Sequence, residues 1–122
     1  MKATDHQDQM ILSWKEVQLQ NHIIQLATAL GWDYYHTHDS RRSPAGFPDL
    51  VLVHRRKRIC LVRELKTEKG RFQPKQERWL QDLRVAGIDA GVWRPGDVVS
   101  QRVQRELSAG TEYGTGSMGV RP

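Results

Sequence analysis

The segment DLVLVHRRKRICLVRELK, residues 49–66, contains two apolar runs joined by four consecutive basic residues. Each run is rich in Leu, Val and Ile, which is typical of strands covered on both faces of a sheet. The basic residues form a polar interruption between them, so the segment predicts a β-hairpin with strands over 49–53 and 59–66 and a loop from Arg55 to Arg58. We expect these to be central strands.

The register of this hairpin decides whether three polar residues share one face of the sheet. We expect His54 to pair with Ile59. The same register places Asp49 opposite Glu64. Side chains of a strand alternate between faces, so Glu64 and Lys66 lie on one face, and Asp49 joins them in this register. A slip of one residue would send Asp49 to the other face.

Asp49, Glu64 and Lys66 together suit the hydrolysis of a phosphodiester. Two neighbouring carboxylates repel and are costly to bury, but they can share a divalent cation, and their oxygens suit Mg²⁺ or Mn²⁺. The metal would activate water, and the Lys66 ammonium would polarise that water or stabilise charge on the phosphate. The alternative is an exposed Glu–Lys pair on an edge strand, with Asp49 as a turn residue. The preceding segment 46–48 (Gly-Phe-Pro) favours the catalytic interpretation.

Two further polar residues lie on the apolar stripes of predicted helices. Glu16 is in line with the apolar residues of the first helix, so it is a candidate catalytic residue and metal ligand; alternatively it closes the helix end. Gln76 has a similar place in the second helix. It would hydrogen-bond a metal-bound water or Lys66, or else face solvent.

The elements around the hairpin alternate between helices and strands. Residues 1–12 are expected to be a polar lead-in. Ser13 should open the first helix with a capping box, supported by a staple of Leu12 against Val17, and Gly31 should end it. The remaining elements are expected as a strand over 33–38, a helix from Pro74 to Gly87, a strand over 88–93 and a short helix over 98–107.

This order predicts an α/β fold. The helix between the third and fourth strands should make them parallel, and the first three strands should be antiparallel. We therefore expect a mixed four-stranded sheet flanked by helices, in the order α-β-β-β-α-β with a short C-terminal helix. The domain should cover residues 1–107, and residues 108–122 should form a flexible Gly- and Ser-rich tail.

Composition favours a nucleic-acid partner inside the cell. The chain has 122 residues, a net charge of +5 and a pI of about 9.7, which favours polyanions. No run approaches the roughly 20 apolar residues that span a bilayer, and the N-terminus carries no apolar signal region. The single cysteine, Cys60, excludes an internal disulfide and a zinc–cysteine cluster; its apolar surroundings predict a small core residue.

Basic residues in predicted loops are candidates for phosphate contact, and the best placed are Arg41, Arg42, Lys69 and Arg71. The alternative is a solvated charged surface, which suits the hairpin loop best. His36 and His38 share a strand face and would form a metal pair, but no third and fourth ligands follow at recognisable spacing. We interpret them as polar strand residues near the DNA.

The motifs from Glu16 to Arg94 resemble the VRR-NUC family, the virus-type replication–repair branch of the PD-(D/E)xK nucleases. The resemblance is carried by the following segments: Glu16, GFPDL at 46–50, VRELKT at 62–67, Gly70-Arg71, Gln76 with Trp79-Leu80, and 83–92. It implies a restriction-endonuclease-like fold with Mg²⁺ or Mn²⁺ held by Asp49, Glu64 and the Leu65 carbonyl. Glu16 would assist, and Lys66 and Gln76 would complete the site.

The resemblance further implies a metal-dependent DNA endonuclease that acts as a homodimer on branched DNA such as Holliday junctions or flaps. The expected location is the cytoplasm of a bacterial or phage-infected cell. Three alternatives stay open. They are a catalytically silent DNA-binding module, which the costly carboxylates disfavour, an RNA nuclease, for which no aromatic stacking platform is evident, and a restriction enzyme, which would need a specificity domain.

Overall fold

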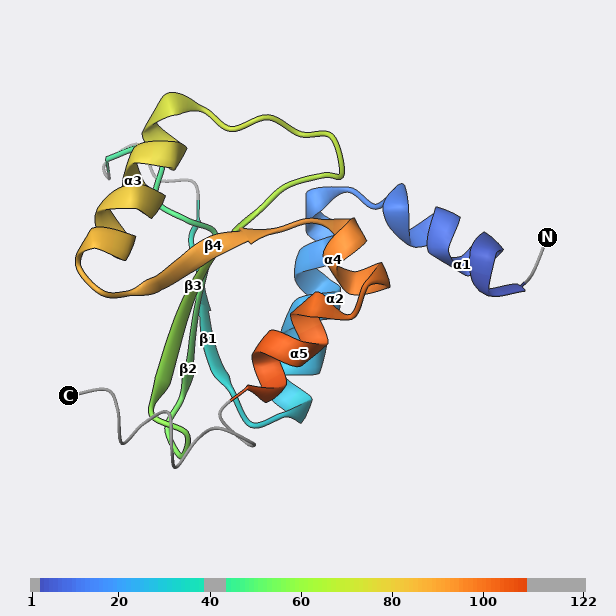
Figure 1. Ribbon diagram of the computed structural model, residues 1–122, viewed down its shortest axis with the longest axis horizontal. Helices are drawn as coiled ribbons and strands as arrows, with labels where there is room; N and C mark the ends of the chain where they lie inside the picture. The colour runs from blue at the N-terminus through green and yellow to red at the C-terminus, as the bar shows by residue number, and fades with distance from the viewer. Residues whose placement is uncertain (1–2, 39–43, 110–122) are drawn as a thin grey trace.

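The computed structural model describes residues 3–38 and 44–109 and has an α/β fold (Figure 1). Its elements, in chain order, are α1 (Ala3–Leu12), α2 (Glu16–Ala29), β1 (Asp33–His36), β2 (Leu50–His54), β3 (Ile59–Leu65), α3 (Pro74–Val85), β4 (Asp89–Trp93), α4 (Pro95–Val99) and α5 (Arg102–Ser108). The strands form one sheet in the order β1-β2-β3-β4. The first three are antiparallel and β4 is parallel to β3, so the predicted mixed sheet is confirmed.

The predicted hairpin register is also confirmed. His54 pairs with Ile59, and Leu50 pairs with Arg63 at the other end of the ladder. The turn between the strands is residues 55–58, and it closes with Arg58 at a φ of 58°. Continued by one residue beyond Leu50, the same register places Asp49 opposite Glu64.

Helices cover the two faces of the sheet differently. On one face, side chains of β2, β3 and β4 pack against α2 and α5 in the main core, which contains Leu19, Ile23, Leu52, Leu61, Trp93 and Leu107. On the other face, Val62 and Ala90 pack against Leu80 of α3 in a smaller cluster. Figure 1 shows α3 on one side of the sheet and α2 and α5 on the other.

The start of the first predicted helix was wrong. Residues 3–12 form α1, which packs against α4, and the N–H and hydroxyl of Ser13 donate to the carbonyl of Met10 at its end. The core helix α2 begins instead at Glu16, where the Lys15 N–H donates to the Gln18 side chain. Val17 is exposed, so the predicted staple is absent. The local polar pattern of 1–12 could not reveal a partner that lies some 80 residues away in the chain.

Two other predictions need correction. The single terminal helix is two helices, because Gln101 adopts a left-handed φ of 65° between α4 and α5. Cys60 is exposed, not a core residue. It lies beside Val53 on the face carrying α3, and α3 packs only over the part of that face near Val62.

The predicted domain boundary lies one residue before the end of α5 at Ser108. Most of the predicted tail, together with Arg41 and Arg42, lies outside the described residues. Within the two described ranges, the helices are all too short or too polar to cross a bilayer.

Neighbouring residues of β2 test this arrangement of faces. Leu52 is fully buried in the main core and Val53 is 41% exposed. Leu52→Ala should lower the free energy of unfolding by about 2–5 kcal/mol, because it leaves a cavity. Val53→Ala should lower it by less than about 1 kcal/mol. Urea denaturation followed by circular dichroism measures both, and equal losses would contradict the arrangement.

Candidate active site

Asp49 is fixed through both its backbone and its side chain. Its carbonyl accepts a hydrogen bond from the Thr37 N–H at 2.8 Å, and the Thr37 hydroxyl donates to the carbonyl of Pro48 at 2.7 Å. Its Oδ2 accepts from the backbone N–H of Leu65 at 2.8 Å. These bonds connect the entry of β2 to β1 on one side and to β3 on the other, so the carboxylate has a defined position.

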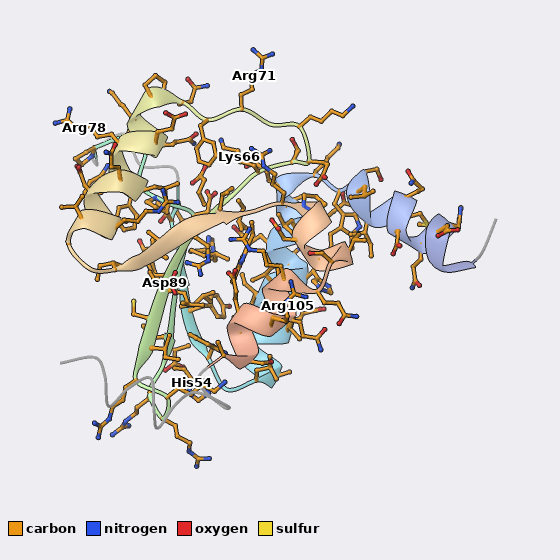
Figure 2. All side chains as sticks on the ribbon, in the orientation of Figure 1. His54, Lys66, Arg71, Arg78, Asp89 and Arg105 are labelled. Carbon is orange, nitrogen blue, oxygen red and sulfur yellow. The ribbon has the colours of Figure 1, made fainter. Side chains whose placement is uncertain are left out.

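Glu64 and Lys66 lie beside Asp49 on the face of the sheet that carries α3. Both are buried, and the Lys66 Nζ is 3.3 Å from Glu64 Oε2. The Lys66 ammonium also lies 5.5 Å from the centre of the Phe72 ring, and its backbone N–H donates to the Trp93 carbonyl. In Figure 2, Lys66 lies inside the curve of the loop that leads from β3 to α3. The predicted grouping of the three residues on one face is thus observed.

The electrostatics of this group centre on Glu64. Burial, followed by the neighbouring negative charge of Asp49, raises the pKa of Glu64 from 4.5 to about 8, although Lys66 acts in the opposite direction. One ammonium therefore does not compensate two carboxylates in this position. A group with raised pKa that faces a second carboxylate is a common feature of functional sites.

The donor set fits a hard divalent cation. Carboxylate oxygens of Asp49 and Glu64 are the ligands that Mg²⁺ prefers, and Mg²⁺ commonly takes only one or two carboxylates and keeps several waters. Among the described residues, no group of three or more His, Cys, Asp or Glu side chains is close enough to hold a metal ion. A site here would therefore use the carboxylate pair with waters and the backbone.

Within the described residues, no hydrogen bond or ion pair joins Glu16 or Gln76 to this group. Glu16 is exposed in the first turn of α2. The side-chain oxygen of Gln76 accepts a hydrogen bond from the Gln73 N–H at 2.9 Å, which caps the start of α3. The catalytic roles of both residues stay predictions.

The predicted DNA-binding residues that the structure describes are Lys69 and Arg71. Both are exposed in the loop between β3 and α3, close in sequence to Lys66. The cations of the β2–β3 turn lie at the opposite end of the sheet, as the positions of His54 and Lys66 in Figure 2 show. The rings of His36 and His38 have centres 4.2 Å apart and are tilted by 57°, and within the described residues they join no metal-binding cluster.

One residue near the site was missed by the sequence analysis. Arg94, which directly follows β4, donates to three backbone carbonyls of the loop after Lys66. No local pattern marks it, because its partners lie 24 to 27 residues earlier in the chain.

A mixed sheet that carries this carboxylate pair and lysine on adjacent strands has the architecture of a nuclease-type fold. The family model described as "VRR-NUC domain" matches residues 2–95. The chain therefore belongs to the VRR-NUC family, as its motifs predicted, and the PD-(D/E)xK placement is consistent with that family.

Solved structures agree with this fold. A structure titled "VRR_NUC domain" matches with a TM-score of 0.61 and 24% identity, and covers 73% of this chain and 94% of its own. A second, titled "VRR_NUC domain protein", matches with a TM-score of 0.55 and 19% identity, covering 78% and 91%. The search of curated proteins found no match.

The raised pKa of Glu64 predicts a pH-dependent stability in the absence of metal. Between about pH 4.5 and 8 the unfolded chain has released a proton that folded Glu64 retains, so stability falls as pH rises through this range. Glu64→Gln removes this effect. Its melting temperature relative to wild type should be higher at pH 8 than at pH 5, measured by calorimetry in EDTA.

A matched control is Glu77→Gln, on the exposed surface of α3. It should preserve the pH dependence of the wild type. A Glu64→Gln difference that is the same at both pH values would show that the folded protein does not hold Glu64 protonated.

Proposed function

We propose that this protein is a metal-dependent DNA endonuclease that hydrolyses phosphodiester bonds in branched DNA, such as Holliday junctions or flaps. The main support is buried Glu64 beside half-buried Asp49, with the Lys66 ammonium 3.3 Å from Glu64. Such a pair is unfavourable in a protein interior unless a cation neutralises it. Because the chain belongs to a nuclease family, that cation would serve in phosphodiester hydrolysis.

In this proposal Asp49, Glu64 and the Leu65 carbonyl hold Mg²⁺ or Mn²⁺, and Glu16 assists from the start of α2. The bound metal would supply an activated water and neutralise charge on the phosphate. The Leu65 N–H donates to Asp49 Oδ2, so the Asp49 carboxylate is already oriented by the backbone before a cation arrives.

Lys66 is the residue best placed to contact the reacting groups. Its ammonium extends from the same face of the sheet as the two carboxylates, so it can orient the attacking water or contact the scissile phosphate. Gln76 would support it through the amide nitrogen, since its oxygen already caps α3. The buried position of Lys66 strengthens these interactions, because water screens them less.

DNA affinity in this proposal comes from basic residues that precede Asp49 or follow Lys66 in the sequence. Lys69 and Arg71 extend from the loop after Lys66, and Arg41 and Arg42 precede Asp49 in the sequence. With a net charge of +5, the chain favours a polyanionic substrate. A DNA substrate would place the activity in the cytoplasm of a bacterial or phage-infected cell.

Substitution of the site residues tests the chemistry. Asp49→Ala, Glu64→Ala and Lys66→Ala should each lower cleavage of a four-way junction by about 100-fold or more, because each removes a group that stabilises the transition state. Wild-type cleavage should require Mg²⁺ or Mn²⁺, stop in EDTA and be poorly supported by Ca²⁺. A cleavage time course on labelled junction, flap and linear DNA measures these effects.

The control separates binding from chemistry. The double substitution of Lys69 and Arg71 by Gln should weaken DNA binding and reduce its salt dependence, but cleavage should recover at saturating protein. Gel-shift titrations should show that Asp49→Ala and Glu64→Ala still bind DNA.

If those two variants cleave like the wild type, a different site is responsible. A wild type that binds DNA without cutting it under any metal condition would favour the silent binding module. Preferential cleavage of RNA would favour the RNA nuclease.

The proposed assembly is a C₂ homodimer. One domain offers one carboxylate pair, whereas symmetric resolution of a four-way junction takes two cuts. Light scattering should therefore give twice the chain mass of 14.1 kDa. A monomer under conditions in which junctions are cut symmetrically would contradict the homodimer.

A further inference from the structure

The loop that follows Lys66 is held by a single guanidinium group. Arg94 Nη1 donates to the carbonyls of Thr67 at 2.8 Å, Gly70 at 2.7 Å and Glu68 at 3.2 Å. Nη1 carries two N–H groups, so at least one of them is shared between two of these carbonyls, and the Nζ of a lysine in the same place would end one bond closer to the backbone. Arg94 thus joins the first residues of this loop to the end of β4.

A second tie joins the same two segments. The Gly96 N–H donates to Glu68 Oε1 at 2.8 Å, and a Cβ at position 96 would lie 2.8 Å from Glu68 Oε2. The backbone N–H of Lys66 also donates to the Trp93 carbonyl at 3.1 Å. Several hydrogen bonds therefore join the start of the loop to the segment between β4 and α4, and Arg94 makes the largest number of them.

The aromatic ring of Phe72 connects Arg94 to Lys66. The Arg94 guanidinium carbon lies 5.9 Å from the ring centre, and the Lys66 Nζ lies 5.5 Å from it. Both distances are within the range of cation–π attraction, so the two cations contact the same ring. The Lys66 ammonium therefore interacts with both the Glu64 carboxylate and the Phe72 ring.

We propose that Arg94 is a positioning residue that sets the place of the Lys66 ammonium by holding residues 67–72 over it. Its catalytic consequence rests on the proposed nuclease function; its effect on the loop does not. Without Arg94, three carbonyls lose their shared donor and Phe72 loses one of its two cations. The loop should then open locally, and Lys66 should gain access to water while the rest of the fold stays intact.

The first test measures the position of Lys66 without any substrate. Arg94→Met keeps much of the side chain's length but removes its donors, and Arg94→Lys keeps the charge on a side chain that ends one bond short of the position of Nη1. Both variants should show faster hydrogen exchange at the amides of 67–73 and acylation of Lys66 by an amine-reactive ester faster by about tenfold, read by mass spectrometry. The effect of Arg94→Lys should be close to that of Arg94→Met.

The matched control is Arg105→Met. Arg105, labelled on α5 in Figure 2, also donates to a backbone carbonyl, that of Ser100, but does not contact the loop. It should change neither the exchange of 67–73 nor the acylation of Lys66. If Arg94→Met unfolds the protein, Arg94→Lys carries the comparison. Unchanged exchange and labelling in the folded Arg94 variants would overturn the proposal.

The second test measures turnover on a labelled four-way junction. Arg94→Met should lower kcat by about 100-fold, as expected for a misplaced catalytic group, and change the Kd for DNA by less than about twofold. A loss confined to binding, or an unchanged kcat despite faster labelling of Lys66, would overturn the positioning role. A wild type that cuts no DNA would defeat the proposed function instead, and the labelling would still decide whether Arg94 places Lys66.

Discussion

The antiparallel ladder between β2 and β3 is the constraint on which the site depends. A four-residue turn pairs His54 with Ile59, and this register carries through five residue pairs to the other end of the strands. A slip of one residue would exchange the faces of β2. Buried Leu52 would then exchange places with exposed Val53, and Asp49 would move away from Glu64. The hydrophobic core and the carboxylate pair are thus specified by the same pairing.

The carboxylate pair of Asp49 and Glu64 needs positive charge or hydrogen-bond donors around it. Glu64 is buried beside a second carboxylate, and its raised pKa reflects a charge that the fold alone does not neutralise. One backbone N–H, which donates to Asp49, and one ammonium, which lies beside Glu64, partly compensate the pair. The negative charge that remains on the pair suits binding of a divalent cation, which in turn would bind a phosphate. The carboxylate pair is therefore both the unfavourable electrostatic feature of the fold and the basis of the proposed chemistry.

The opposite face of β3 also carries a buried charge, that of Arg63, and protein side chains alone compensate it. Arg63 is buried beneath Trp93, and it pairs with Asp89 at 3.0 Å and with Glu106 of α5 at 3.1 Å. Several hydrogen bonds lower the pKa of Glu106, in contrast to that of Glu64. This network ties α5 to the strand that carries the site. One face of β3 therefore carries a buried cation paired with two carboxylates, with only Arg63 Nε lacking a hydrogen-bond partner among the described residues, and the other face carries an incompletely compensated carboxylate pair.

The sequence by itself was enough to predict the α/β class, the hairpin register, the four-stranded sheet and the grouping of Asp49, Glu64 and Lys66. These features follow from local periodicity and from the alternation of side chains along a strand. The contacts of α1 with α4, the exposure of Cys60 and the break at Gln101 were decided by the tertiary structure. The tertiary structure also decided the hydrogen bonds from Arg94 to the loop that follows Lys66. The α1 contacts, the exposure of Cys60 and the Arg94 bonds depend on which distant parts of the chain pack against a residue, and local pattern carries no record of those partners.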